Sequence, residues 1–225
     1  MKHVTLTFDN GPEPDVTPGV LDILAKENVP ATFFVLGHKI AEPDRRKLAE
    51  RAHAEGHWIG NHTFNHDTPL GRVEGPNVPE DEIGRTQELI GDLSHPDKFF
   101  RPFGGGGALG PHLLSRPVAD FLTAGAYTCV LWNVIARDWA DADGWVETAM
   151  EIMAPQDQSL VVIHDLPTGA MAARMARPRP LPRRCGSAYM RLTSPVSASC
   201  IFKDPMATAV PASSRATKTV ASDDE

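Results

Sequence analysis

The chain has 225 residues, of which 41% are hydrophobic and 23% are charged, a length that suits one full-sized domain rather than a small disulfide-stapled scaffold. Its net charge of −7 argues against nucleic acid or an anionic membrane surface as a partner. Its three cysteines lack the C-x-x-C spacing of many zinc sites, which argues against a cysteine-rich metal centre.

Short β-rich apolar runs alternate with helical patterns over the first 170 residues. Strands that alternate with helices favour a mainly parallel sheet, either open or closed into a barrel. The predicted elements are, in chain order, a strand at His3–Phe8, a helix at Val16–Glu27, a strand at Ala31–Leu36, a helix at Arg45–Glu55, a short strand at Trp58–Gly60, a helix at Glu80–Leu93, a short strand at Phe99–Arg101, a helix broken by Pro117, a strand at Tyr127–Val134, a helix at Gly144–Met153 and a strand at Leu160–His164.

The composition changes after Ala170. Residues 171–225 contain nine Lys and Arg against four acidic residues, a net charge of +5, which leaves −12 for residues 1–170. Because this segment is rich in Pro, Ser and Ala and has no sustained apolar period, we expect residues 1–170 to fold and 171–225 to form a disordered basic tail. The N-terminus reaches Asp9 before a signal-like apolar stretch can form, and no apolar run of about 18 residues follows, which predicts a cytoplasmic protein.

Polar residues of catalytic type follow five of the predicted strands. Parallel α/β folds place their active sites at these strand ends, so the five segments are expected to converge. In chain order they are Thr7-Phe8-Asp9-Asn10-Gly11-Pro12, His62-Thr63-Phe64-Asn65-His66, Arg101-Pro102-Phe103-Gly104, Arg137-Asp138-Trp139 and His164-Asp165.

His62 and His66 are a candidate pair of metal ligands. Their i, i+4 spacing predicts that both imidazoles lie on one face of a helical turn, where they can hold one cation. A catalytic site with an open water position needs a third ligand, and the pair Asp9-Asn10 is the obvious source. Considered alone, the two histidines fit a solvated loop equally well.

The segments TFDNGP, HTFNH, RPFGG, RDW and VVIHD occur in the order of the five motifs of the polysaccharide deacetylase family, also called the nodulation-B homology domain or carbohydrate esterase family 4. The chain resembles this family over residues 3–170. The resemblance implies an α/β fold of the distorted (β/α) barrel type and a catalytic domain at residues 1–170. It also implies the metal-dependent removal of acetyl groups from carbohydrates that contain N-acetylglucosamine, such as chitooligosaccharide or peptidoglycan.

The resemblance assigns catalytic roles to four residues. Asp9 resembles the catalytic base, and Arg101 resembles the arginine that orients this base, a task for which a planar guanidinium is well suited. His164 resembles the general acid that protonates the leaving amine, and Asp138 resembles the acidic residue that tunes this histidine.

The resemblance also assigns the binding residues. His62 and His66 match the histidine ligands of the metal, and Asn10 occupies the position of a third ligand. This donor set favours zinc, with cobalt, nickel and manganese as alternatives. The predicted substrate-binding residues are Phe103, Gly104 and Trp139.

Three features depart from the family pattern. Asn10 stands where an aspartate is usual, and its neutral amide should lower the affinity for metal. Ile135 stands where the fourth motif usually has another aspartate. The family implies a further helix and strand after His164, but residues 171–225 have a foreign composition, which predicts a barrel incomplete at its C-terminal end. A shifted reading frame or a chimeric C-terminus is one hypothesis that accounts for this tail.

Two alternatives stand beside a sugar deacetylase. The same scaffold can hydrolyse another small amide, because the metal and acid–base residues do not specify a sugar. The chain can also be a catalytically weak carbohydrate-binding protein, because Asn10 replaces a charged ligand. The sequence leaves the oligomeric state open.

Overall fold

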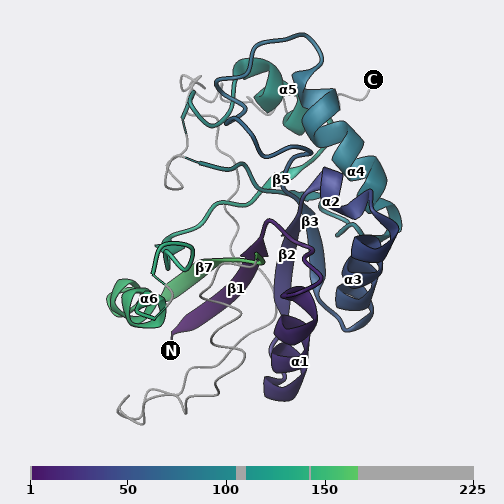
Figure 1. Ribbon diagram of the computed structural model, residues 1–225. Coiled ribbons are helices and arrows are strands. Elements are labelled where there is room, and N and C mark those ends of the chain that lie inside the picture. The colour runs from purple at the N-terminus through teal and green to yellow at the C-terminus, as the bar shows by residue number, and fades with distance from the viewer. Residues whose placement is uncertain (1, 105–109, 142, 167–225) are drawn as a thin grey trace, which may run out of the picture.

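The computed structural model describes residues 2–104, 110–141 and 143–166 (Figure 1). The predicted tail at 171–225 lies outside the described residues. The strands are β1 (His3–Asp9), β2 (Ala31–Val35), β3 (Trp58–Asn61), β4 (Phe99–Phe100), β5 (Thr128–Cys129), β6 (Val134–Ile135) and β7 (Gln158–His164). The helices are α1 (Thr17–Glu27), α2 (Gly37–Ile40), α3 (Pro43–Ala54), α4 (Arg85–Ile90), α5 (Arg116–Ala124) and α6 (Trp145–Met153), and the π-helical turn η1 (Glu80–Gly84) and the 3₁₀ turn η2 (Gly91–Leu93) flank α4. In the described part of the chain, no helix has the length and apolar character needed to cross a membrane.

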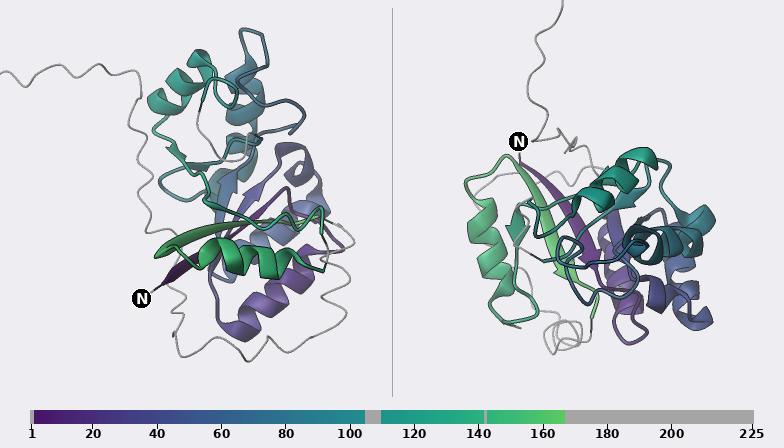
Figure 2. Two further views of the ribbon diagram at one scale, coloured as in Figure 1. Left: turned by 90° about the vertical axis from the view of Figure 1, so that its left-hand side faces the viewer. Right: turned by 90° about the horizontal axis from the view of Figure 1, so that it is seen from above.

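The seven strands that the structure describes form one parallel sheet in the order β5-β4-β3-β2-β1-β7-β6. The sheet curls, as the two views of Figure 2 show, and β5 and β6 are its two edge strands. This arrangement confirms the prediction of an α/β fold with an incomplete, distorted barrel.

The sequence prediction was wrong at two places in the second half of the chain. The single strand predicted at Tyr127–Val134 is two short strands, β5 and β6, which lie at opposite edges of the sheet. The helix expected to break at Pro117 is intact, because Pro117 lies in its first turn, where the missing N–H costs no hydrogen bond.

Side chains alternate between the two faces of the sheet, and this alternation separates the core from the site. On the outer face, Phe33 and Val35 of β2 pack with α1, α3 and α6 in the main core. Phe34, between them, points the other way and joins a second cluster inside the half-barrel, with Phe99 and Leu160. Asp9, at the end of β1, pairs in register with Phe34 and with His164 at the end of β7, so both polar residues lie on this inner face.

Candidate active site

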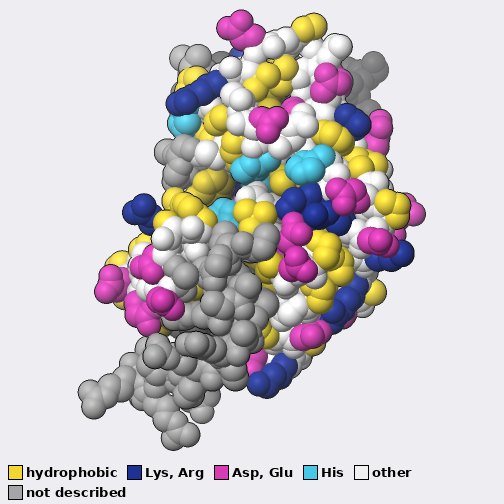
Figure 3. Space-filling model, in the orientation of Figure 1, with side chains coloured by type: hydrophobic (Ala, Val, Ile, Leu, Met, Phe, Trp, Pro, Cys, Tyr) yellow, Lys and Arg dark blue, Asp and Glu magenta, His cyan; other side chains and the backbone are white. Residues whose placement is uncertain are grey.

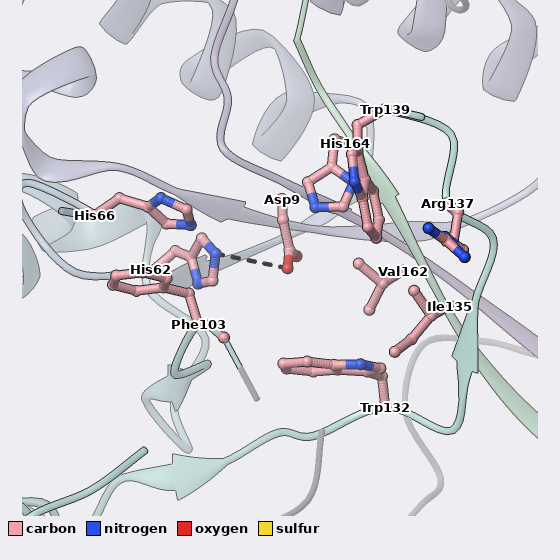
Figure 4. A pocket seen from close by; sticks show the side chains of 11 residues that line it. Asp9, His62, His66, Phe103, Trp132, Ile135, Arg137, Trp139, Val162 and His164 are labelled. Atoms are coloured by element: carbon pink, nitrogen blue, oxygen red, sulfur yellow. Dashed lines mark ion pairs between the residues drawn. The ribbon is translucent and has the colours of Figure 1, made fainter. Parts of the chain in front are cut away.

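The ends of β1 and β7 bring two predicted catalytic residues together. Asp9 and His164 are the last residues of these neighbouring parallel strands, and they occupy paired positions in the register. Both line a groove of about 540 Å³ (Figure 4). The residues around it come from β1, β6 and β7 and from the loops that follow β3, β4, β5 and β6. They are Asp9, His62, His66, Phe103, Gly104, Trp132, Ile135, Arg137, Trp139, Val162 and His164. Histidine side chains gather near the middle of this face, beside hydrophobic ones (Figure 3).

Arg101 holds Asp9 from beneath the groove. Its guanidinium donates one hydrogen bond to the Asp9 Oδ1 atom and one to the Thr7 Oγ1 atom, both at 2.7 Å. It lies 4.0 Å from the centroid of the Phe34 ring, on top of the inner cluster, and its side chain is fully buried. Burial lowers the pKa of Arg101, and the facing carboxylate opposes this shift; a guanidinium stays protonated in proteins. The base predicted from the sequence is therefore fixed by a buried ion pair.

The segment from His62 to His66 is a loop, so the helical turn expected from the i, i+4 spacing was wrong. Thr63 and His66 have left-handed backbones, with φ of 73° and 60°. The Glu82 carboxylate holds the loop by accepting the N–H groups of Phe64 and Asn65, each at 3.0 Å. Although the loop is not helical, it brings the two imidazoles together, with 4.9 Å between the ring centroids.

The hydrogen bonds of His62 define which of its nitrogens is available. Its Nδ1 atom lies 2.7 Å from the carbonyl oxygen of Arg101, and a carbonyl only accepts, so Nδ1 carries the proton. The Nε2 lone pair then faces the groove, 3.6 Å from the Asp9 Oδ2 atom. Burial lowers the pKa of both His62 and His66, the latter to about 3, and a neutral imidazole is the form that ligates metals.

Asn10 follows the strand that ends at Asp9, and its side chain carries an amide oxygen. Its backbone is left-handed, with φ of 72°, a conformation that asparagine tolerates better than most residues. Its Oδ1 atom is buried and has no hydrogen-bond partner among the residues that the structure describes. Within those residues no three His, Cys, Asp or Glu side chains are grouped for metal binding. The orphaned oxygen and the two neutral imidazoles fit a divalent cation.

His164 is held by Asp138 across the end of β7. The Asp138 Oδ1 atom accepts a hydrogen bond from His164 Nδ1 at 2.9 Å, and Oδ2 accepts one from the His164 backbone N–H at 2.8 Å. Asp138 is completely buried, whereas the imidazole of His164 is 18% exposed and opens to the groove. Since Nδ1 donates to the carboxylate, Nε2 is the nitrogen that stays available, and the imidazole lies in the groove lining (Figure 4).

The three predicted substrate-binding residues lie at the rim of the groove. Trp139 is 49% exposed, and its ring meets His164 edge-on at 4.7 Å. The ring of Phe103 stacks on His66 at 3.9 Å, so one of its faces supports a predicted metal ligand. Gly104 has φ of 93°, which favours glycine.

Sequence reasoning missed several residues of the groove. Val162 lies two positions before His164 on the same face of β7, and a period of two would have indicated it. Trp132 comes from the chain between β5 and β6, where the sequence carries no such period. Ile135 and Arg137 belong to the segment of the fourth motif, but no site role was predicted for either. Thr7 and Glu82 contact site residues only through the tertiary structure.

The chain is similar to known proteins in sequence and in fold. Residues 1–108 match the family model described as polysaccharide deacetylase. The chain is 37% identical over 167 residues to the chitooligosaccharide deacetylase of Rhizobium leguminosarum bv. phaseoli, with 71% of this chain and 66% of that protein covered. It is 35% identical over 166 residues to that of R. leguminosarum bv. trifolii, with 73% and 72% covered.

The fold also matches a solved structure, that of the Bc1960 peptidoglycan N-acetylglucosamine deacetylase. The TM-score is 0.63 and the sequence identity is 30%, with 77% of each chain covered. The family-model match spans β1 to β4, and the two relatives and this structure each match about three quarters of the chain. The chain therefore belongs to the polysaccharide deacetylase family.

Proposed function

We propose that this protein is a metal-dependent hydrolase that removes N-acetyl groups from oligosaccharides or polysaccharides containing N-acetylglucosamine. One observation supports it above the others: the Asp9–Arg101 pair and the His164–Asp138 pair face one groove beside two neutral imidazoles. Relatives of the chain are named chitooligosaccharide deacetylases, so a carbohydrate is the proposed partner.

The reaction needs a base for the attacking water and an acid for the leaving amine. Asp9 is the proposed base, because Arg101 occupies only its Oδ1 atom and leaves Oδ2 facing the groove. His164 is the proposed acid, because its Nδ1 atom is engaged by Asp138 and its Nε2 atom is available to the leaving nitrogen. The two residues end neighbouring strands, so a substrate amide in the groove reaches both.

Asn10, His62 and His66 would hold the divalent cation, for which zinc is the first choice and cobalt, nickel or manganese are alternatives. When bound, such an ion polarises the amide carbonyl and offsets the negative charge that develops on its oxygen. Asn10, like the two neutral imidazoles, brings no charge to this set. The lack of charge supports the alternative of a weak or silent carbohydrate-binding protein. The other alternative, a hydrolase of small amides on the same scaffold, would use the same residues as the sugar deacetylase.

Metal content and acetate release test the proposal in one preparation. We expect the wild type to bind a divalent metal and to release acetate from N-acetylchitooligosaccharides, and chelation to abolish this release. Asn10→Asp should lower the metal dissociation constant by about tenfold or more, because a carboxylate adds a charge to the ligand set. Aspartate also tolerates the left-handed backbone at this position, so the loop should keep its shape.

The possible results separate the three functions. Release by the wild type supports the deacetylase. Silence in the wild type with recovery in Asn10→Asp supports the binding protein. Silence in both, with metal bound, would contradict sugar deacetylation, and a panel of small amides then tests the remaining alternative.

Trp139→Ala is expected to raise KM for a chitooligosaccharide by about two- to tenfold, which corresponds to the binding free energy that one stacked aromatic ring contributes. Trp139 is the half-exposed wall of the groove, so its loss removes a surface on which a sugar ring can stack. Saturation kinetics on the variant provide the measurement. Trp139→Phe, which retains a flat face, is the control, and equal KM values in all three proteins would refute this role.

A further inference from the structure

Asp165 is a buried carboxyl group that the proposed reaction does not use. It is the first residue after β7 and follows His164 directly. Its backbone N–H donates a hydrogen bond of 2.7 Å to the carbonyl oxygen of Asp9, and the residue is fully buried. A backbone hydrogen bond therefore links the end of β7 to the residue proposed as the base.

The side chain of Asp165 contacts the loop that follows Asp9. Its Oδ2 atom accepts a hydrogen bond from the Thr17 hydroxyl at 2.7 Å, and this hydroxyl accepts one from the Glu13 N–H at 2.6 Å. A Cβ atom built on Gly11 would lie 2.2 Å from the same Oδ2 atom, so the loop backbone rests directly on the carboxyl group. Asp165 thus touches the loop at its start, in its middle and, through Thr17, at its end.

We propose that Asp165 is a positioning residue, whose contacts with Gly11 and Thr17 fix the loop carrying Asp9 and Asn10 against the end of β7 that carries His164. The inference rests on the proposed function for its catalytic consequence. The far end of the loop is held separately, by the Glu13 carboxylate with Arg45 at 2.7 Å and Lys39 at 3.1 Å. The middle of the loop, next to Asn10, depends on Asp165.

Asp165 makes a structural contact and does not line the groove. Burial raises the pKa of this carboxyl to about 7, against the lowering effects of the Thr17 hydrogen bond and of Lys39. Its Oδ1 atom has no hydrogen-bond partner within the described residues. An asparagine has the same shape and keeps an acceptor for the Thr17 hydroxyl, so Asp165→Asn should preserve the contact.

The test removes the Thr17 hydroxyl and leaves Asp165 in place. Thr17→Val removes the hydroxyl with little change of shape, and Thr17→Ser keeps a hydroxyl. Thr32→Val is the matched control, because Thr32 is equally buried and its hydroxyl has no partner among the described residues. Hydrogen exchange is measured at the amides of Asp165 and Leu36, which donate to Asp9 and Gly11. Neither residue is changed by the threonine substitutions, and in Asp165→Asn only the Leu36 amide is compared. Acetate release gives kcat and KM for the same proteins.

In Thr17→Val we expect both amides to exchange about tenfold faster and kcat to fall about tenfold, with KM changed less than about twofold. Thr17→Ser, Asp165→Asn and Thr32→Val should stay close to wild type. The inference is overturned if Thr17→Val has the same amide exchange rates as Thr32→Val, or the same kcat. The exchange measurement needs no turnover, so it decides on the loop contact even where the wild type releases no acetate and the proposed function fails.

Discussion

Arg101→Met is expected to lower the free energy of unfolding by about 3–5 kcal/mol and to abolish acetate release. The substitution leaves the Asp9 carboxylate buried without its counter-charge, and breaking one side of a buried pair costs more than the pair itself contributes. Hydrogen bonds from the guanidinium to Thr7 and to the Val130 carbonyl are lost as well. Methionine fills much of the space above Phe34, so the loss of charge dominates over the loss of volume.

Chemical denaturation of the variant gives the free energy, and acetate release gives the activity. The matched control is Arg116→Met, which breaks a pair with Asp120 in which both side chains are largely exposed, and which should change stability little. The double variant Asp9→Asn/Arg101→Met should be more stable than Arg101→Met alone, because no unpaired carboxylate is left. Equal stability of Arg101→Met and Arg116→Met would show that the buried pair does not hold the site.

His164→Asn is expected to lower kcat by about 10²–10⁴-fold, the usual contribution of one positioned acid or base. Asparagine cannot donate the proton that the leaving amine requires. Asp138→Asn should also lower kcat, because both oxygens of Asp138 accept hydrogen bonds from His164 and an amide can replace only one of them. Either the backbone N–H or the Nδ1–H group of His164 would then face the NH₂ group of the new asparagine, which is also a donor.

The pair is expected to act as one unit. His164→Asn/Asp138→Asn should therefore be no slower than His164→Asn alone, and kcat of all three variants is measured together with their melting temperatures. His53→Asn, on the exposed side of α3, is the control for a histidine outside the groove. A His164→Asn protein that keeps more than about one tenth of wild-type kcat would contradict the role of general acid.

Much of the fold and the position of the candidate site could be predicted from the sequence. Apolar runs of strand length that alternate with helical patterns led to the curled parallel sheet, and the ends of parallel strands converge wherever such a sheet forms. Asp9 and His164 were predicted at these ends, and the structure places them side by side. Their chemical roles stay predictions until they are measured.

Local periodicity was misleading where contacts distant in sequence decide the backbone. The spacing of His62 and His66 suggested a helical turn, but the Glu82 carboxylate holds the segment as a loop with left-handed residues. The apolar run at Tyr127–Val134 suggested one strand, but the curled sheet needs two short pieces at its opposite edges. Neither the hydrogen bonds from Glu82 nor the pairing of the two short strands can be read from the few residues that each local pattern covers.

The sequence by itself determined the order of the elements, the family and the residue types at the strand ends, because these depend on side-chain periodicity and on contiguous motifs. Only the tertiary structure decided which atoms are available: Nε2 of His62 and His164, Oδ2 of Asp9 and the orphaned oxygen of Asn10. An atom is available when the other polar atom of the same side chain is already bound. The residues that bind it, such as Arg101 for Asp9 and Asp138 for His164, follow other strands of the sheet and are brought close by folding.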